Sequence, residues 1–389
     1  MILGIQITNY DVFEDETIGL MMEQSLEQMG DSKCRLRNLN ALIGRNNTGK
    51  TSFLMAMSFV KRCLNQGVAE ASKADGRPGF SNLIMDGGKT SDFKIFFRVK
   101  DAVEKKTIFM QYELSLAATK FGSPVVRSEK VLKSHKDGTI EELMNLTDGV
   151  GTVMGSEAQI TDEHLTALSV YGKIALLKDL ALLYKEIDGW FFCRFSAEMS
   201  NTYYMDGNAP GGHSHLSSSG ANVNNVLEYM ESEDPVKYEK MIIDITSKIP
   251  QMRVKKTLPK NLDASPDKLF LYLLLMREKN PHTTIFMETP DRDLYHDMVD
   301  VLAQEMREFS LNNPYCQIIF TTHNPYIIES MTPNEVWVFR REYGEEEDTN
   351  VSVFCAGSDK VVDALAKEGV GMGAIWYGGH LDSESDDAY

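Results

Sequence analysis

One segment of the chain combines a glycine loop, a lysine and a hydroxyl residue at the spacing that binds phosphate. It runs from Gly44 to Thr51 as Gly-Arg-Asn-Asn-Thr-Gly-Lys-Thr, which matches the pattern G-x-x-x-x-G-K-[ST]. In such a loop the backbone N–H groups surround the phosphates, the lysine reaches the β- and γ-phosphates, and the hydroxyl ligates Mg²⁺. We therefore predict that Lys50 contacts the phosphates and that Thr51 binds the magnesium ion.

The segments on either side of this loop have the composition that a phosphate site needs. Residues 39–43 are apolar and predict a strand, and residues 52–60 have a helix-forming composition. The predicted nucleotide contacts are the residues of the loop and of the first helical turn: Gly44, Asn46, Asn47, Thr48, Gly49, Lys50, Thr51 and Ser52.

Two apolar segments later in the chain end in polar residues that complete the predicted site. Residues 283–288 end in Glu288, and residues 317–322 are followed by His323. Both segments have the composition of buried strands in a parallel sheet. Because ligands of such sheets lie at the carboxyl ends of the strands, we expect Glu288 and His323 beside Lys50. Glu288 would then face the magnesium ion, and His323 would sense the γ-phosphate.

Five segments, in the correct order, resemble the ABC-class ATPases of the RecF and overcoming-lysogenization-defect (OLD) type. The loop around Asn46 is similar to that family's G-x-N-x-x-G-K-[ST], and residues 321–325 are similar to its T-T-H-[SN]-P. Residues 216–227 resemble G-x-N-[LV]-x-x-[VI]-L, residues 285–294 resemble I-F-I-E-E-P-E-R-N-[IL], and residues 371–379 resemble a tryptophan motif near the end of such chains. Several ordered matches over nearly the whole chain are more specific than any one of them.

The resemblance implies an α/β fold, a P-loop NTPase of the ABC-ATPase head type, in which a mixed sheet is joined to an antiparallel β part and a helical subdomain. It implies ATP and Mg²⁺ as cofactors, a homodimer closed around ATP, and a separate effector protein such as a nuclease. Small single-head members of this kind belong to bacterial anti-phage defence systems. The resemblance therefore implies a nucleotide-gated switch or sensor, with a DNA-repair ATPase as an alternative.

The domain plan that follows is a single head over residues 1–389. We assign the nucleotide core to 1–65 and 258–345, the antiparallel part to about 90–135, the helical subdomain to about 160–250, and an acidic tail to 382–389. The predicted elements are a first strand at 2–7, a hairpin from 93–99 and 107–116, a third strand at 125–132, one long amphipathic helix from a cap at Thr161 to Ile187, a flexible loop at 199–219, and helices at 223–230 and 238–249.

A departure from the family pattern lies beside Glu288. Aligning Pro290 with the family's proline puts Glu288 at the magnesium-side carboxylate and Thr289 where the catalytic glutamate belongs. A threonine cannot serve as general base, and loss of a general base costs about 10²–10⁴-fold in rate. This alignment predicts slow hydrolysis with binding retained. In the alternative register Glu288 is the base, and Met287 would occupy the metal position.

The second departure is in the ABC signature, which in the family presents a serine and a glycine to ATP on the opposite subunit. Here Ser265 remains as a predicted trans contact to ATP, and Pro266 suits the start of a helix. Asp267 stands in place of the glycine and would repel a phosphate unless a cation such as Lys268 intervened. Both departures indicate a slow or silent ATPase.

Composition narrows the remaining functions. The formal charge of −17 disfavours binding to a nucleic-acid backbone, which would need a local basic groove. No apolar run approaches the roughly 18 residues of a membrane helix, and the first seven residues lack the basic start of a signal peptide, so we expect a cytoplasmic protein. The five cysteines are scattered without a C-x-x-C pair, and His213 with His215 in a loop is a weak metal motif.

Three function classes remain from the sequence. The first is the slow ATPase switch, the second is a non-hydrolysing scaffold that holds ATP and sequesters a partner, and the third is a phosphotransferase, which leaves His323 without a role. No heptad pattern separates Lys50 from Glu288, which excludes the long arms of chromosome-organising relatives. Too few residues follow His323 for the nuclease domain of OLD proteins, so any cleavage is expected to come from a partner.

Overall fold

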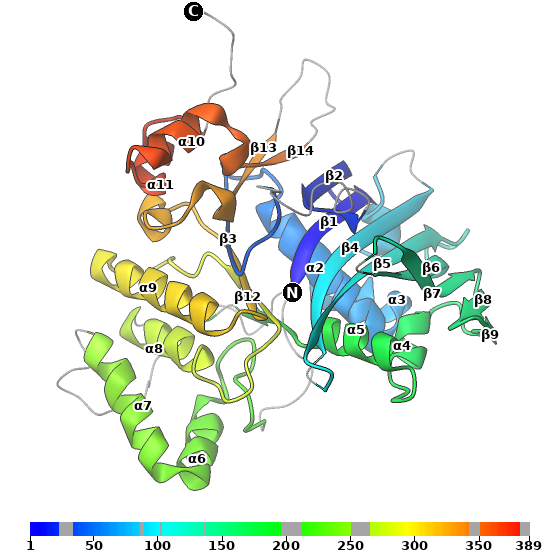
Figure 1. Ribbon diagram of the computed structural model, residues 1–389, viewed down its shortest axis with the longest axis horizontal. Coiled ribbons are helices and arrows are strands. Elements are labelled where there is room, and N and C mark those ends of the chain that lie inside the picture. Colours follow the sequence, from blue (N-terminus) through cyan, green and yellow to red (C-terminus); the bar gives the residue numbers. More distant parts are fainter. Residues whose placement is uncertain are drawn as a thin grey trace, which may run out of the picture.

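Two sheets organise the fold in the computed structural model, which describes residues 1–22, 34–85, 89–101, 103–135, 137–193, 195, 212–249, 265–341 and 351–381. One sheet has eight strands in the order β2-β1-β4-β5-β6-β7-β8-β9, and the other has six in the order β10-β11-β12-β3-β13-β14. In Figure 1 the eight-stranded sheet lies on one side of the molecule and helices α6 to α9 lie on the other.

The strands of the eight-stranded sheet are β1 (Ile2–Tyr10), β2 (Phe13–Gly19), β4 (Thr90–Asp101), β5 (Lys106–Ala118), β6 (Pro124–Ser134), β7 (Ile140–Thr147), β8 (Val150–Val153) and β9 (Ser156–Gln159). Those of the six-stranded sheet are β3 (Leu39–Ile43), β10 (Trp190–Cys193), β11 (Thr284–Glu288), β12 (Gln317–Thr321), β13 (Val336–Arg341) and β14 (Val351–Cys355).

The α-helices are α2 (Lys50–Gln66), α3 (Val68–Ala71), α4 (Ala167–Tyr171), α5 (Lys178–Asp188), α6 (Val223–Glu233), α7 (Pro235–Lys248), α8 (Ser265–Leu275), α9 (His296–Asn312), α10 (Lys360–Lys367) and α11 (Met372–Tyr377). Short 3₁₀ helices are η1 (Ala74–Gly76), η2 (Phe80–Asn82), η4 (Pro325–Ile328), η5 (Pro333–Glu335) and η6 (Ala356–Ser358).

The six-stranded sheet is buried on both faces. β10, β11, β12, β3 and β13 pair in parallel, and β14 adds an antiparallel edge. Alternate side chains of one strand enter different cores: Leu42 joins the core on the α2 side, whereas Ala41 and Ile43 join the core on the opposite side. Such strands read as continuous apolar runs. This explains why β3, β11 and β12 could be predicted from the sequence.

Helix α2, which begins at the phosphate loop, lies between the two sheets. Phe53 packs edge-on against Phe339 of β13 at 6.1 Å between ring centroids, and Phe59 packs against Phe93 of β4 at 5.9 Å. Contacts on both sides bury most of the apolar side chains of this helix. The first turn of α2 is therefore held in a fixed position relative to both sheets.

Helix α8 is the centre of the core on the other face of the six-stranded sheet. All residues from Leu269 to Leu275 are buried, and α8 packs against α7 and α9. A helix that is apolar on all sides needs neighbours on all sides. These helices and the sheet that carries the phosphate loop, together with the separate antiparallel sheet, make an α/β fold with a mixed sheet, an antiparallel β part and a helical part, as predicted.

The single long helix predicted from Thr161 to Ile187 is wrong. The chain forms two helices, α4 and α5, separated by residues 172–177, and the first helical residue is Ala167. Gly172 lies at the break, where a Cβ would meet Leu168 O at 2.5 Å and the Tyr184 Cβ at 2.5 Å. This glycine allows the two helices to approach closely. The apolar residues on both sides of the break keep a helical spacing, which is why the sequence predicted a single helix.

The strand predictions for the antiparallel part are confirmed, but the sheet extends beyond them. β4 and β5 pair as the predicted hairpin, and β6 pairs with β5. Strands β2, β7, β8 and β9 were not predicted because they are short or carry few apolar residues. The helices predicted at 223–230 and 238–249 correspond to α6 and α7. Residues 199–211 of the predicted loop and the acidic tail lie outside the described residues.

Among the described helices, none is both long enough and apolar enough to span a membrane.

The start of α4 depends on one buried carboxylate. Glu129 of β6 accepts hydrogen bonds from Ala167 N, from Leu168 N at 2.8 Å and from the Tyr112 hydroxyl at 2.9 Å. Glu129 is 1% exposed, so water cannot replace the hydrogen bonds that its carboxylate accepts. Glu129 therefore caps α4 and fixes it to the antiparallel sheet.

We predict that Glu129→Gln lowers the free energy of unfolding by about 1–3 kcal/mol, because an amide NH₂ would then face the Ala167 N–H and leave buried groups unsatisfied. Urea denaturation measures this loss. The matched control is Glu142→Gln on the neighbouring strand, where the carboxylate is 41% exposed in its pair with Lys130 and contributes little. Equal stability of the two variants would contradict the capping role.

Candidate nucleotide site

The loop between β3 and α2 has a backbone that its sequence requires. Gly44 has φ 138° and Gly49 has φ 95°, both in the region that favours glycine. A Cβ on Gly44 would lie 2.2 Å from Phe339 O, so a side chain is excluded there by space as well as by conformation. Asn47 also has a positive φ, of 64°, which asparagine tolerates better than most residues. The predicted phosphate loop thus has the turn that its glycines imply.

Lys50 is folded into this loop. Its Nζ donates to Gly44 O at 2.8 Å, to Arg45 O at 2.5 Å and to Thr48 Oγ1 at 3.3 Å. The residue is only 5% exposed. Burial lowers the pKa of the Lys50 ammonium to about 8. A buried lysine without a carboxylate among these partners is well suited to receive an anionic ligand.

The hydroxyl of the loop and the carboxylate of β11 meet at the end of the sheet. Thr51 Oγ1 donates to Glu288 Oε1 at 3.1 Å, although the two residues are far apart in the sequence. A hydroxyl and a carboxylate oxygen are hard donors of the type that Mg²⁺ prefers. The residues present at this position therefore fit a magnesium ion, and the roles of Thr51 and Glu288 as its ligands stay predictions.

Strand register brings the other predicted residues to the same edge. Glu288 pairs with Thr321 across β11 and β12, and Thr321 pairs with Leu42 across β12 and β3. His323 follows β12 directly, and the phosphate loop follows β3 directly. Partial burial and the nearby charge of Lys50 lower the pKa of His323, which favours the neutral imidazole. Lys50, Thr51, Glu288 and His323 thus meet at one edge.

Thr289 occupies an unfavourable backbone conformation beside this edge. Its φ is 42°, where a β-branched residue is strained, and its N–H donates to Thr321 Oγ1 at 3.0 Å. Asp291, two residues later, is 9% exposed, and burial raises its pKa. The contact between Thr51 and Glu288 favours the register in which Glu288 faces the metal and Thr289 takes the position of the general base. The catalytic roles remain predictions.

The start of α8 is attached to the turn after β11. Lys268 Nζ donates to Arg292 O, and burial lowers the pKa of this lysine. Lys268 is 6% exposed and faces the interior of its own chain, so it does not extend outward to neutralise a phosphate on another subunit as the sequence suggested. Asp267 lies in the first turn of α8, of which Ser265 is the first residue. The contact of Ser265 and Asp267 with ATP across a dimer stays a prediction.

Three residues near the loop were missed by the sequence reasoning. Val12, in the turn between β1 and β2, and Val351 of β14 lie within 3.4 Å of the position of a Cβ on Gly49. Arg341 donates to Asn47 O at 3.3 Å. Nothing in the local sequence marks these residues, because they reach the loop through the pairing of distant strands.

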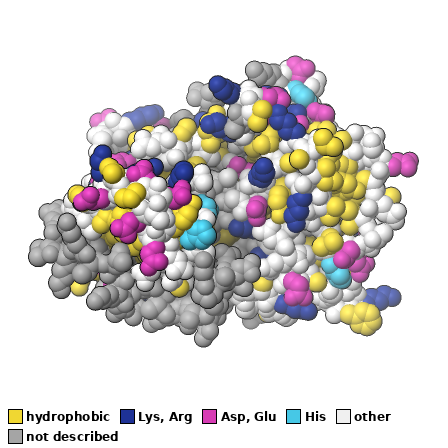
Figure 2. All heavy atoms as spheres, turned by 90° about the horizontal axis from the view of Figure 1, so that it is seen from below, with side chains coloured by type: hydrophobic (Ala, Val, Ile, Leu, Met, Phe, Trp, Pro, Cys, Tyr) yellow, Lys and Arg dark blue, Asp and Glu magenta, His cyan; other side chains and the backbone are white. Residues whose placement is uncertain are grey.

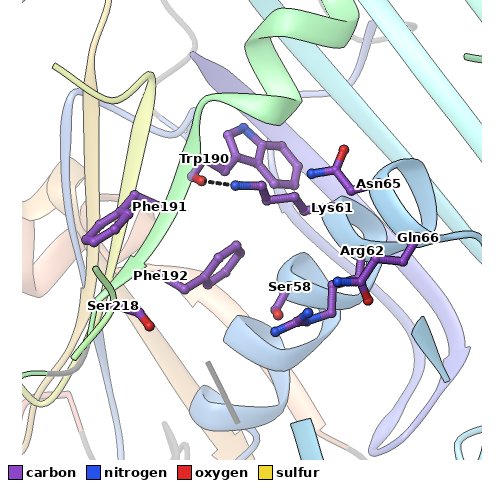
Figure 3. Close-up of a pocket in the computed structure, with 9 residues that line it drawn as sticks. All are labelled: Ser58, Lys61, Arg62, Asn65, Gln66, Trp190, Phe191, Phe192 and Ser218. Atoms are coloured by element: carbon purple, nitrogen blue, oxygen red, sulfur yellow. Dashed lines mark hydrogen bonds between the residues drawn. The ribbon is translucent and has the colours of Figure 1, made fainter. Parts of the chain in front are cut away.

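A separate polar hollow of about 80 Å³ lies farther along α2 (Figure 3). Ser58, Lys61 and Arg62 of α2 line one side, and aromatic residues of β10 line the other. Lys61 donates to Trp190 O at 2.6 Å. Lys61 lies about 16 Å from Lys50 along the helix axis at 1.5 Å per residue. The hollow is therefore distinct from the nucleotide site.

Charge on the described surface does not gather into one basic area on the face shown in Figure 2, where acidic and basic side chains are intermixed. This agrees with the overall charge of −17. Residues 253–256, a short basic segment with the sequence Arg-Val-Lys-Lys, lie outside the described residues.

Three solved structures align with the chain along most of its length. The head of SMC bound to the C-terminal winged-helix domain of ScpA covers 91% of this chain and 97% of its own, at 11% identity and a TM-score of 0.45. The SMC head domain from Thermotoga maritima covers 91% and 98%, at 12% identity and a TM-score of 0.42. An Smc head with an extended coiled coil, bound to the C-terminal domain of ScpA from Pyrococcus furiosus, covers 94% and 99%, at 10% identity and a TM-score of 0.44.

No protein-family model and no curated protein matches the sequence. The three TM-scores are all below 0.5, so the likeness is too remote to specify a function. The function is therefore proposed from the geometry of the candidate site.

We predict that the affinity for ATP falls as pH rises above about 8, because the buried ammonium of Lys50 loses its proton in this range. The free Lys50 has a pKa of about 8, and a bound triphosphate raises it because negative charge favours the ammonium form. Above pH 8 the complex then holds more protons than the free protein, so a rise in pH weakens binding, by at most about tenfold per pH unit.

Calorimetry at several pH values, in buffers of different ionisation enthalpy, measures both the affinity and the proton uptake. The control is Lys50→Arg, whose guanidinium stays charged throughout this range, so its weaker affinity is independent of pH. Wild-type affinity that stays constant from pH 7 to 10, without proton uptake, would show that Lys50 does not face the phosphates.

Proposed function

We propose that this chain is an ATP-binding ATPase of the ABC type that hydrolyses ATP slowly and acts as a nucleotide-gated switch. The observation that carries this proposal is the 3.1 Å contact between Thr51 Oγ1 and Glu288 Oε1 at the mouth of the phosphate loop. It joins the hydroxyl of the loop to the carboxylate of the second strand, beside Lys50 and His323. Hydroxyl, carboxylate and buried lysine together match the needs of a nucleoside triphosphate with Mg²⁺.

Each of these residues has one task in the proposed site. Backbone N–H groups from Gly44 to Thr51 and the ammonium of Lys50 bind the β- and γ-phosphates. Thr51 and Glu288 hold Mg²⁺, which when bound neutralises charge on the phosphate oxygens. Neutral His323 offers a hydrogen bond at the position of the γ-phosphate and so distinguishes the triphosphate from the diphosphate.

Slow hydrolysis follows from Thr289. This side chain has no titratable group, so it cannot take the proton of the attacking water. Binding energy from the loop, Lys50 and Glu288 is unaffected by this change. The ATP-bound state would therefore be long-lived, as a switch requires.

The biological setting is proposed from the resemblance to RecF and OLD-type proteins. We infer a role in bacterial anti-phage defence, in the cytoplasm, with a separate effector such as a nuclease. An ATP-dependent homodimer would place the partner's Ser265 opposite Lys50. Asp267 near the triphosphate weakens such a dimer through like-charge repulsion, so Asp267→Gly is expected to tighten it in light scattering with ATP.

A second candidate is a scaffold that binds ATP without hydrolysing it and sequesters a partner. Thr289 favours this function to the extent that no other group replaces the missing base. Turnover separates the two candidates: phosphate release that is lost in Lys50→Ala supports the ATPase, and stable binding without release supports the scaffold.

We predict that Lys50→Ala abolishes ATP binding, because the phosphates lose the point charge that compensates them. ATP at 100 times its dissociation constant should stabilise the wild type by about 2.7 kcal/mol, and the variant should show no thermal shift. Lys61→Ala, on the same helix but beside the separate hollow, is the matched control and should retain the shift. Equal shifts in wild type and Lys50→Ala would overturn the proposed site.

We further predict that Thr289→Glu raises the rate of hydrolysis by 10²-fold or more, since it restores a carboxylate at the position of the general base. Glutamate also relieves the β-branched strain at φ 42°. Thr289→Gln has the same size without the carboxylate and should remain slow. If wild type already hydrolyses ATP rapidly and Glu288→Gln stops it, then Glu288 is the base and the other register holds.

A further inference from the structure

Three side chains of metal-ligating types, from distant segments, meet near the start of β11, which is the end of this strand opposite Glu288. They are His215 in the segment before α6, Glu278 just after α8, and His282 just before β11. One ligand atom of each residue lies within 4.8 Å of the others. His215 Nδ1 is 2.6 Å from Glu278 Oε2, and His282 Nε2 is 3.5 Å from the same oxygen. The sequence paired His215 with His213, but His213 instead packs against Tyr229.

The carboxylate at the centre is completely enclosed. The side chain of Glu278 is 0% exposed, and its second oxygen accepts a hydrogen bond from Leu216 N at 2.8 Å. That bond leaves Oε2 directed at the two imidazoles. A backbone donor that fixes the free oxygen of a ligating carboxylate is an arrangement found around metal ions.

Contacts outside the cluster hold the ring of His282 and the backbone of His215 in place. The ring of His282 stacks on Phe191 of β10, at 4.3 Å between centroids and 14° between planes. The carbonyl of His215 accepts a hydrogen bond from Asn222 Nδ2 at 2.9 Å, which ties the segment before α6 to the start of that helix. The ligand set is therefore positioned before any ion binds.

One nitrogen of the cluster is used only weakly by the ion pair. His282 Nε2 is buried, and its contact with Glu278 Oε2 is long, at 3.5 Å, and falls short of good hydrogen-bond geometry. The same carboxylate oxygen is already paired with His215 Nδ1 at 2.6 Å. A buried nitrogen held only by a long contact is poorly stabilised, and a metal ion bound to Nε2 would stabilise it better.

The spacing fits a small ion. Ligand atoms on a tetrahedral ion with bonds of about 2.0–2.1 Å are about 3.3 Å apart. The distance of 3.5 Å between His282 Nε2 and Glu278 Oε2 already matches, and that of 2.6 Å from His215 needs to open by less than 1 Å. His215 is 37% exposed and offers the path of entry, with water as the fourth ligand.

We propose that His215, Glu278 and His282 bind a divalent transition-metal ion of the Zn²⁺ type. Two imidazoles and one carboxylate form a ligand set that zinc takes in proteins. The ion would tie the segment before α6 to the connection between α8 and β11. Because β11 ends at Glu288, the site would also anchor the strand that carries the proposed magnesium ligand. This inference does not depend on ATP binding.

The experiment uses the tag-free full chain, stripped with a chelator and titrated with ZnCl₂ in a calorimeter. We expect one equivalent to bind at this cluster and to raise the thermal midpoint. Co²⁺, used as a probe, should give the visible absorption of a tetrahedral ion. His215→Gln and His282→Gln should each weaken binding at least 10–100-fold, whereas His213→Gln should bind as the wild type does.

Because Glu278 and His282 are buried, a variant at either position can fail to fold. His215→Gln, at the most exposed ligand, keeps the test decisive in that case. Absence of Zn²⁺ binding to the wild type would overturn the proposal. Unchanged affinity and stoichiometry in His215→Gln would do so as well, since the metal would then be held by other residues. Loss of Zn²⁺ binding with ATP binding intact would separate this site from the nucleotide site.

Discussion

The position of α2 between the two sheets is the constraint on which the rest of the structure depends. This helix is packed against β13 on one side and β4 on the other, so its first turn cannot shift without opening the core between the two sheets. Lys50 and Thr51 form that turn. Burial of the helix therefore fixes the two residues that we propose to receive the nucleotide, and it also withdraws the ammonium of Lys50 from water. The same burial lowers the pKa of Lys50 and keeps the phosphate loop rigid.

The parallel strands supply the other half of the site through their register. Glu288, Thr321 and Leu42 lie side by side across three strands, so the segments that follow them emerge together at one edge. The proposed absence of a general base is also a local feature. Thr289 has no titratable group, and its N–H donates to Thr321 Oγ1. In the proposed site, affinity and turnover thus depend on different residues, so we expect binding to be retained where hydrolysis is slow.

Much of this arrangement could be predicted because buried parallel strands leave a clear trace in a sequence. The strands β3, β11 and β12 are mainly apolar, and the phosphate loop has a fixed spacing of glycines. The long helix was wrong because apolar periodicity does not register a glycine break at Gly172. His282 and Glu278 were missed as companions of His215, since only the packing of α8 against the sheet brings the three together. Val12, Val351 and Arg341 were missed for the same reason.

The central claim is that the chain holds ATP at the buried phosphate loop and converts it slowly. The most direct test is to incubate the purified chain with ATP and Mg²⁺, isolate the complex by rapid gel filtration, and identify the bound nucleotide by chromatography over time. The account predicts about one nucleotide per chain, recovered mainly as ATP long after an ordinary ATPase, with turnover of about 1–10³ s⁻¹, would have consumed it. Recovery of the protein without nucleotide, or with ADP formed at once, would contradict it.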